Sequence, residues 1–437
     1  MIGEKRIGVR QRVRGGKLCE LKTGSDFHSR PTSGRDIFRR RRWAMRLRSV
    51  FPAAFILSLT ESAFAQDQRP TGYPRSANER GDQPVTVSAV YTADLRSNVR
   101  GGIRRGTRYL DNLDLQLAID ADQLVGWYGA RMFVYGIYNN GASISRLVGD
   151  AQAISNIETK VRAARLFEAW LEQDVGSAGS IKARLYNLNS EFDTTQSGGL
   201  FLLSSHGIGA DIAQTGRNGP SIFPITSLAI RGEVKLGEHW LGRVAILDGV
   251  PGDPAHPKRT AIKLSGKDGA LVVGEVNYLE GGSKAAIGVW SYTARFDKLP
   301  PSPDTGRGNK GIYAFVERRL IGTRADDAVG LAGWLRFGIA DKRYNPIGSY
   351  FGGGLVYTGL TPSRSNDQIG LSFASANFGN VHKRSTSGRD VVIEAVYNAV
   401  LTPWLSIQPD VQYVVNPGGN PAPADAVVIG LQFKVGQ

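Results

Sequence analysis

Two segments near the end of the chain, LSIQPDVQYVV (405–415) and AVVIGLQFKV (426–435), decide the fold. In both, apolar residues recur at every second position, and the residues between them are mostly small, amide or charged. A period of two indicates a β-strand with two unlike faces. A soluble β-sandwich has strands of about 5 to 6 residues, whereas a strand tilted across a bilayer needs about 9 to 11. The length of these segments therefore favours strands that cross a membrane.

The same period recurs from residue 85 onward, in stretches separated by Gly, Asn, Asp and Pro. No stretch after residue 66 approaches the roughly 20 apolar residues of a membrane-spanning helix. We therefore predict an all-β fold, a transmembrane antiparallel β-barrel of about 16 strands over residues 85–437. The predicted strands are 85–95, 113–122, 129–139, 164–175, 180–188, 227–236, 241–249, 269–279, 284–295, 310–321, 330–341, 349–359, 367–377, 391–401, 405–416 and 426–435.

The predicted connections alternate in length, at first cleanly: 96–112 and 140–163 are long, and 123–128 and 176–179 are short. Outer-membrane barrels have short periplasmic turns and long external loops. With both termini periplasmic, the longest connection, 189–226, becomes the third external loop. A connection of that length in a compact fold is usually functional.

Residues 1–65 read as a leader. From Met45 a basic stretch is followed by an apolar run and then by Ala63-Phe64-Ala65, the pattern of a secretory signal peptide. We predict cleavage between Ala65 and Gln66, which leaves residues 66–84 as a short periplasmic N-terminal segment. Residues 1–44 have no apolar periodicity and are either sequence upstream of the true start or an unusually long leader. A twin-arginine export signal has only the Arg pairs to support it.

The basic charge of the chain lies mostly in that leader. Of 54 Lys and Arg, 15 fall in residues 1–65, against 5 of the 39 Asp and Glu, so the remainder holds 39 basic and 34 acidic side chains. A folded nucleic-acid binder keeps its positive charge on the folded part. We therefore expect no nucleic-acid partner.

The sequence offers little for catalysis. Cys19, the one cysteine, lies in the leader, so the rest of the chain has no thiol for a disulfide, a metal or a nucleophile. No H-E-x-x-H or G-x-S-x-G motif occurs. We expect no enzyme activity, no metal and no cofactor. The histidines after the leader fall in predicted loops or turns, where we expect them to be solvated: His206, His239, His256 and His382.

The polar strand faces carry charges of both signs. An Arg or Lys on the lipid face near the midplane would cost about 2 to 4 kcal/mol, so we expect these faces to turn inward. Sixteen strands are wide enough to enclose an aqueous channel. Such charges either contact a solute or merely pair with one another in a wet lumen. The candidates for solute contact are Arg184, Arg231, Arg336, Glu172, Glu233, Trp170 and Tyr186.

The predicted register of one hairpin indicates which class of solute the channel lining would bind. Placing Glu172 opposite Arg184 and Trp170 opposite Tyr186 gives alternating charge beside an aromatic pair. Sugar hydroxyls both donate and accept, and a sugar ring has an apolar face, so this lining suits a sugar. An anion-selective pore would need mostly Arg and Lys.

The loop 189–226 is the predicted constriction. It carries charges among the apolar residues Phe192, Phe201 and Phe223, which would anchor it. Its candidate constriction residues are Glu191, Asp193, Asp211 and Arg217.

Several segments together resemble the carbohydrate-selective porin B (OprB) family over nearly all of residues 85–437. The last two of the following are the most specific: LDNLDLQLAIDADQLVGWYGARMFV (110–134), ARLFEAWLEQD (164–174), ITSLAIRGEVKL (225–236), AILDGVPGDP (245–254), SYFGGGLVYTGLTPSRSNDQIGLSFA (349–374) and LTPWLSIQPDVQYVVNPGG (401–419). The resemblance implies a multi-pass barrel in the outer membrane of a Gram-negative bacterium. It also implies passage of mono- and oligosaccharides and a third external loop folded inward as an eyelet. The implied partners are carbohydrate solutes, outer-membrane lipid and the outer-membrane assembly machinery.

Two other functions stay open at this stage. The net charge of the chain after the leader suggests an anion or general small-solute porin, and the long loops suggest a structural or adhesive barrel. Neither barrel width nor the resemblance distinguishes a monomer from a homo-oligomer.

Overall fold

The computed structural model describes residues 83–302, 304–322, 329–379 and 388–436. The leader, the predicted cleavage site at Ala65 and Gln66, residues 66–82 and His382 lie outside the described residues.

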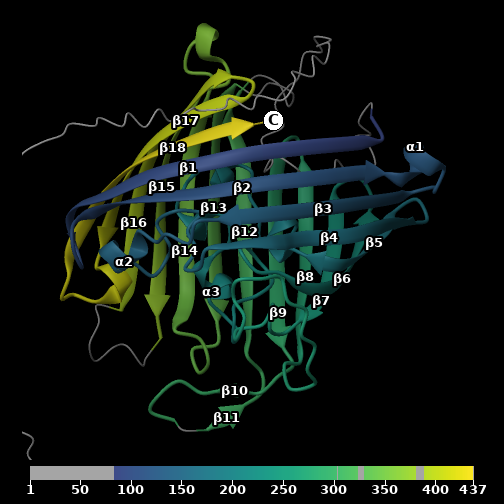
Figure 1. The fold of residues 1–437 in the computed structure, drawn as a ribbon, viewed down its shortest axis with the longest axis horizontal. Helices are drawn as coiled ribbons and strands as arrows, with labels where there is room; N and C mark the ends of the chain where they lie inside the picture. Colours follow the sequence, from purple (N-terminus) through teal and green to yellow (C-terminus); the bar gives the residue numbers. More distant parts are fainter. Residues whose placement is uncertain (1–82, 303, 323–328, 380–387, 437) are drawn as a thin grey trace, which may run out of the picture. The chain divides into compact units, whose positions relative to one another are not determined.

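Sixteen antiparallel strands form a closed barrel, in which β1 pairs with both β2 and β18 (Figure 1). This confirms the predicted fold class. Two further strands, β10 and β11, pair only with each other, in the connection between β9 and β12. The strands are β1 (Val85–Gly102), β2 (Gly106–Asp120), β3 (Ala130–Asn139), β4 (Ala163–Val175), β5 (Gly179–Tyr186), β6 (Ser227–Leu236), β7 (Trp240–Asp248), β8 (Ala270–Glu280), β9 (Ser283–Tyr292), β10 (Phe296–Asp297), β11 (Thr305–Gly306), β12 (Lys310–Ile321), β13 (Gly330–Ala340), β14 (Ile347–Thr358), β15 (Gln368–Phe378), β16 (Arg389–Thr402), β17 (Leu405–Val415) and β18 (Ala424–Gly436).

The helices are short and lie in connections. No helix in the described parts of the chain is long and apolar enough to cross a membrane. They are α1 (Ala121–Val125), α2 (Ser145–Val148) and α3 (Ala210–Ala213), with the 3-10 helices η1 (Leu188–Ser190), η2 (Ser197–Leu200), η3 (Ser204–His206), η4 (Pro362–Arg364) and η5 (Pro417–Gly419).

The two faces of the wall are the reverse of those of a soluble protein. Leu371 on β15 is 58% exposed, whereas Glu394 on the neighbouring β16 is fully buried. The same holds on β17, where Val411 is exposed and Gln412 is buried. Apolar residues therefore face outward, where lipid would cover them, and polar residues face the interior.

The long connection predicted at 96–112 is wrong. β1 and β2 stay paired from Val85 to Asn98, and only residues 103–105 separate the two strands. The predicted loop includes Arg96 and Arg108. Arg96, however, is a buried residue of the inner face, where a charge does not end a strand.

The remaining connections sort onto the two ends of the barrel. One end, here the long-loop end, carries 140–162, 187–226, 249–269 and 293–309. The other, the short-turn end, carries turns such as 176–178, 237–239 and 281–282. Because the number of barrel strands is even, β1 begins and β18 ends at the short-turn end.

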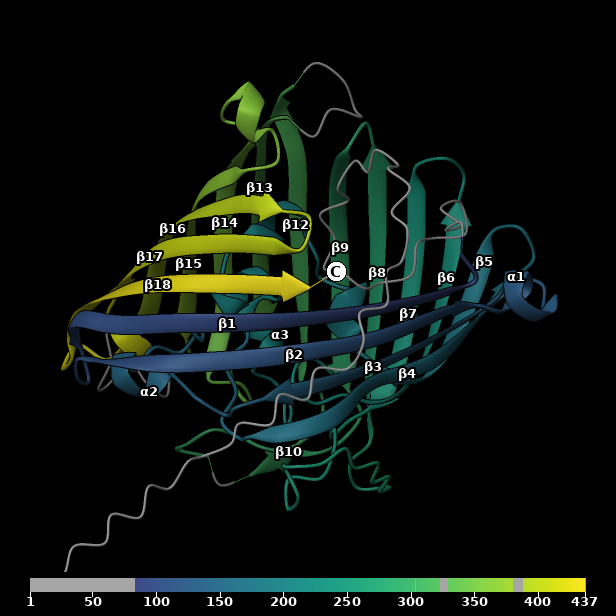
Figure 2. The ribbon, with the colours of Figure 1, turned by 45° about the horizontal axis from the view of Figure 1, so that its top comes forward.

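Two of the long loops fold into the barrel. Helix α3, in loop 187–226, lies within the ring of strands in both views (Figures 1 and 2). It packs against β13 and β14, and its residues Ala210, Asp211 and Ile212 are buried. Loop 140–162 contributes the buried residues Leu147 and Ile154 to a cluster with residues of β14 to β18. The interior is therefore filled by loops as well as by wall side chains.

Candidate functional site

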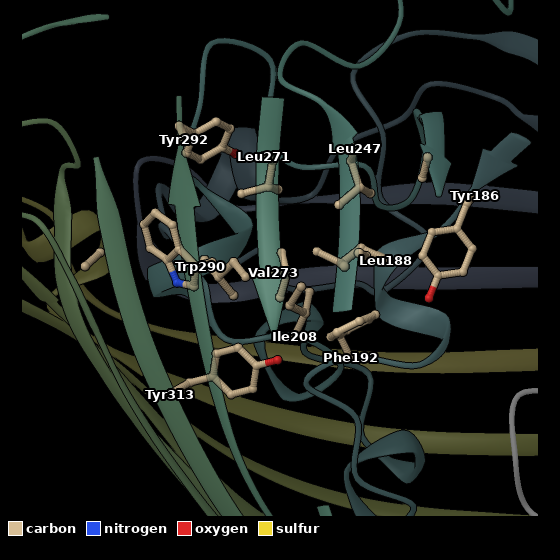
Figure 3. Close-up of a cluster of buried hydrophobic side chains, with 14 of the residues drawn as sticks. Tyr186, Leu188, Phe192, Ile208, Leu247, Leu271, Val273, Trp290, Tyr292 and Tyr313 are labelled. Atoms are coloured by element: carbon tan, nitrogen blue, oxygen red, sulfur yellow. The ribbon is translucent and has the colours of Figure 1, made fainter. Parts of the chain in front are cut away.

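Loop 187–226 is anchored on one side by an apolar core. Figure 3 shows Leu188, Phe192 and Ile208 of this loop beside Leu247 and Val273 of the wall, all in one buried cluster. Phe192 is therefore an anchor, as predicted. The other predicted anchors pack elsewhere: Phe201 lies with Trp334, Val356 and Val396, and Phe223 meets Phe167 edge to face.

Glu191 is the centre of a dense charge cluster on the same loop. Its carboxylate accepts hydrogen bonds from Lys182 at 2.7 Å, from Tyr186, and from Arg231 at 2.8 and 2.7 Å. Arg231 also donates to Glu172 at 2.7 Å. A loop carboxylate is thus bound by two cations of β5 and β6.

The electrostatics of this cluster favour the ionised carboxylate. Burial would raise the pKa of Glu191, but the charges of Lys182, Arg231 and Arg243 outweigh it and hold that pKa well below its usual range. The anchor therefore stays charged throughout the physiological pH range.

Beside this anchor runs a row of charged side chains that are partly open to solvent. Arg131 on β3 pairs with Asp174 at 2.5 Å and with Glu172 at 3.6 Å. On the far side, Arg243 on β7 pairs with Glu233 at 2.6 Å. These five side chains are 11% to 23% exposed. We call them the charged row.

The aromatic pair predicted to face the solute is covered by protein. Tyr186 is 1% exposed and Trp170 is 4% exposed. The indole of Trp170 donates to Glu168 at 3.1 Å, and its ring lies 4.0 Å from the ammonium of Lys182. Trp170 therefore contacts Lys182, and Tyr186 contacts Glu191.

The predicted register of this hairpin is wrong by two residues. Glu172 lies opposite Lys182, not Arg184, and Trp170 lies opposite Arg184, not Tyr186. The reason is a tighter turn: the strands stay paired until only residues 176–178 remain between them.

Arg184 interrupts the regular strand. It has a φ of 107°, and its side chain is exposed. Within the described residues it makes no ion pair or hydrogen bond, unlike Arg231 on the neighbouring strand.

A second anchor forms around Arg336 on β13. Its guanidinium donates to Asp193 at 3.0 and 2.7 Å, and also to Asp211. It also lies over the rings of Tyr313 and Tyr350, at 5.4 and 5.2 Å. Asp193 and Asp211 are thus brought together by one wall arginine.

Two glycines make room for this pair. An added Cβ at Gly338 would lie 2.1 Å from Asp211 Oδ2, and one at Gly209 would lie 2.1 Å from Arg336 Cζ. Neither position has space for a methyl group unless the ion pair moves.

Three wall glutamates hold the backbone of the loop, a role that the sequence did not reveal. Glu275 on β8 accepts from the Asp193 N–H at 2.8 Å. Glu317 on β12 accepts from residues 196 and 197, at 2.8 and 2.5 Å. Glu394 on β16 accepts from residues 202 and 203, at 2.7 and 3.2 Å. Each carboxylate satisfies amides that would otherwise be buried without a partner.

Loop 140–162 supports loop 187–226 from behind. Gln412 donates to the Ile154 carbonyl at 2.9 Å, and Ser155 donates to Asp94 at 2.6 Å. On its inner side, Ser204 N–H donates to the Ala153 carbonyl at 3.0 Å. We did not predict from the sequence that this loop enters the barrel.

His206 is buried, so the expectation that it would be solvated is wrong. Its Nε2 lies 2.9 Å from Ser372 Oγ and 4.0 Å from Glu394. Its ring stands edge to face on Trp334 and tilted against Phe201. Burial lowers the pKa of His206 to about 3.

Arg217 lies apart from the other predicted constriction residues. It donates to the carbonyls of Lys267 and Arg295 and pairs with Asp268 at 3.4 Å. Its side chain is 42% exposed. It joins three loops and contacts neither the Glu191 cluster nor the Arg336 cluster.

The described residues contain no cluster of three or more His, Cys, Asp and Glu side chains suited to a metal ion. What the interior does contain is a set of charged side chains partly open to solvent, beside an inward-folded loop. Together with an apolar outer face, this defines the class of outer-membrane diffusion channels, the porins.

The sequence matches the family described as "Carbohydrate-selective porin, OprB family" over residues 104–436. The chain belongs to this family and is a sugar-diffusing porin of the Gram-negative outer membrane. It is 24% identical to Porin B of Pseudomonas aeruginosa over 396 residues, which is 79% of this chain and 86% of the relative.

Solved structures share the fold. The high-pH structure of Pseudomonas putida OprB superposes with a TM-score of 0.71 at 19% identity, covering 81% of this chain and 94% of that one. The low-pH structure of the same protein gives 0.52 at 16% identity, covering 81% and 93%.

Proposed function

We propose that a sugar passes beside loop 187–226, with its hydroxyls moving along the charged row. The observation that supports this is that Arg131 and Arg243 flank three carboxylates, Glu172, Asp174 and Glu233, all partly open to solvent. The row therefore offers both donors and acceptors, which sugar hydroxyls can use together. Each exchanged hydrogen bond is worth only about 0.5 to 1.5 kcal/mol net, which keeps binding loose enough for flux.

The remaining candidates take other parts in this proposal. Arg231 and Arg336 are buried and hold the loop, so they shape the opening without presenting free donors. Trp170 and Tyr186 are covered, so we assign them to positioning Lys182 and Glu191 and not to stacking on the ring. Arg184 is exposed and remains a candidate for direct contact with the solute.

The test is a double variant, Arg131→Gln with Arg243→Gln, studied by glucose block of the ion current in planar bilayers. Losing two charge-assisted donors should weaken glucose block by roughly tenfold. The matched control is Arg217→Gln with Arg343→Gln, which removes two exposed arginines from the long-loop end. This control should leave glucose block within about twofold.

Chloride-to-potassium selectivity, measured on the same channels, separates the rival functions. If anion preference falls while glucose block is unchanged, the charged row only sets the electrostatic field in the channel. That result would favour an anion-selective porin. If no conductance is found at all, the result would favour a structural or adhesive role for the barrel.

A further inference from the structure

Arg165 occupies an unusual position on β4. Its neighbours Ala164 and Leu166 are exposed on the outer face, whereas Arg165 is buried and lies opposite Ile137 of β3, itself buried. It is the third residue of a strand that starts at the long-loop end. Arg165 therefore faces the interior near the external mouth of the channel.

Other buried arginines of the wall have two carboxylate partners each. Arg96 pairs with Asp94 and Asp410. Arg231 and Arg336 have two each as well. Arg165 is only 7% exposed, yet no described carboxylate lies within ion-pair distance of it.

The side chain of Arg165 has one polar contact among the described residues. Its Nη2 donates to the Pro257 carbonyl at 2.5 Å, while Nε and Nη1 are buried without a partner. A guanidinium cannot lose its charge in a protein, and an isolated buried charge costs several kcal/mol. The N–H groups on Nε and Nη1 therefore lack an acceptor among the described residues.

The segment that covers Arg165 is basic and fixed in place. Pro257 is followed by Lys258 and Arg259, both exposed. Thr260 then hydrogen-bonds to the backbone of Leu166, at 2.7 Å from its nitrogen and 3.0 Å from its oxygen. Two exposed cations thus directly follow the residue that contacts Arg165, for which the described residues supply no counter-ion.

We propose that Arg165 and the covering segment 257–259 form an entrance site for an oxyanion, the phosphate or carboxylate group of an acidic solute. Exposed Lys258 and Arg259 attract the anion, and the free donors of Arg165 bind it with charge-assisted hydrogen bonds. The site is separate from the charged row, so it adds an acidic-solute preference to a channel that conducts neutral sugars.

The same chemistry is present in the phosphates of lipopolysaccharide, the other oxyanion near an external mouth. The inward direction of Arg165 favours a solute over a lipid headgroup. The experiment therefore uses bilayers of neutral phosphatidylcholine, with and without added lipopolysaccharide.

Inorganic phosphate is the probe, titrated against the chloride current of the full-length mature porin. Wild-type current should fall as phosphate binds, and Arg165→Gln should weaken this block at least about tenfold, equivalent to about 1.4 kcal/mol. Arg165→Lys keeps the charge and should retain part of the block. The matched control is Arg162→Gln, which removes an exposed arginine of the same rim and should change the block less than about twofold.

Glucose block is measured on the same variants and should be unchanged by Arg165→Gln. A wild-type channel that phosphate does not block overturns the proposal directly, even if Arg165→Gln fails to insert. A second contrary result is a phosphate block that differs between wild type and Arg165→Gln only when lipopolysaccharide is present. That result would assign the site to a lipid headgroup and overturn the proposal that it binds a solute. Loss of glucose block in every variant would instead count against the charged row.

Discussion

At Gly338 a single hydrogen takes the place of a side chain next to the buried pair of Arg336 and Asp211. Gly338→Ala would put a carbon 2.1 Å from Asp211 Oδ2 and 2.5 Å from Arg336 Nη1, so the anchor must shift. Such overpacking typically costs about 1 to 3 kcal/mol. We expect a lower thermal midpoint in detergent and a larger, noisier single-channel current.

Gly232→Ala is the matched control for this prediction. Gly232 is also in a barrel strand, but a Cβ there would have no heavy atom within 4 Å. If Gly338→Ala behaves like Gly232→Ala, the Arg336 anchor does not set the opening.

His206 gives a second prediction at this scale. Its pKa is about 3 in the folded protein because the ring is buried, against about 6.5 when unfolded. Between these values the unfolded chain binds the extra proton, so stability falls as the pH drops from about 6.5 toward 3. The slope attributable to His206 should approach 1.4 kcal/mol per pH unit.

The pH dependence of the thermal midpoint tests this. His206→Gln should flatten the profile between about pH 6.5 and 3, whereas His256→Gln, at an exposed side chain of loop 249–269, should leave it unchanged. Parallel profiles for wild type and His206→Gln would show that the carboxylates alone control acid sensitivity.

At the scale of elements, segment 194–203 is the part of loop 187–226 bound by Glu317, Glu394 and Lys284. Deleting Thr194 to Leu203 removes the bulk that fills this side of the lumen, so single-channel conductance should rise. A double variant, Glu317→Gln with Glu394→Gln, keeps the bulk but weakens the anchoring and should raise current noise more than mean conductance. Unchanged conductance in the deletion would place the constriction elsewhere.

Strand positions could be predicted wherever apolar and small residues alternate. The ranges 227–236 and 310–321 agree with β6 and β12 to the residue. Prediction failed where polar residues of the inner face come close together, as around Arg96 and Arg108, because a wet interior removes the contrast between strand and loop. The register of the β4–β5 hairpin failed because the length of the turn depends on its backbone geometry, and here only residues 176–178 separate the paired strands.

For the whole molecule, the barrel could be predicted because lipid requires every strand to alternate apolar outward residues with polar inward residues. The contacts within the candidate site could not be predicted. Glu191 and Asp193 were identified as loop charges, but their partners Arg231 and Arg336 lie 40 and 143 residues further along the chain. Only closure of the barrel decides which wall charge meets which loop charge, and no local pattern encodes that.

The three glutamates that hold the loop backbone come from β8, β12 and β16, within a run of seven neighbouring strands of the barrel. All of them follow the loop in the order of synthesis. The loop amides therefore lack these protein acceptors until strands made later have come into place. A barrel that has not yet closed has no narrow passage, so an assembly intermediate in the membrane would leak, and selectivity would be the last property the protein acquires.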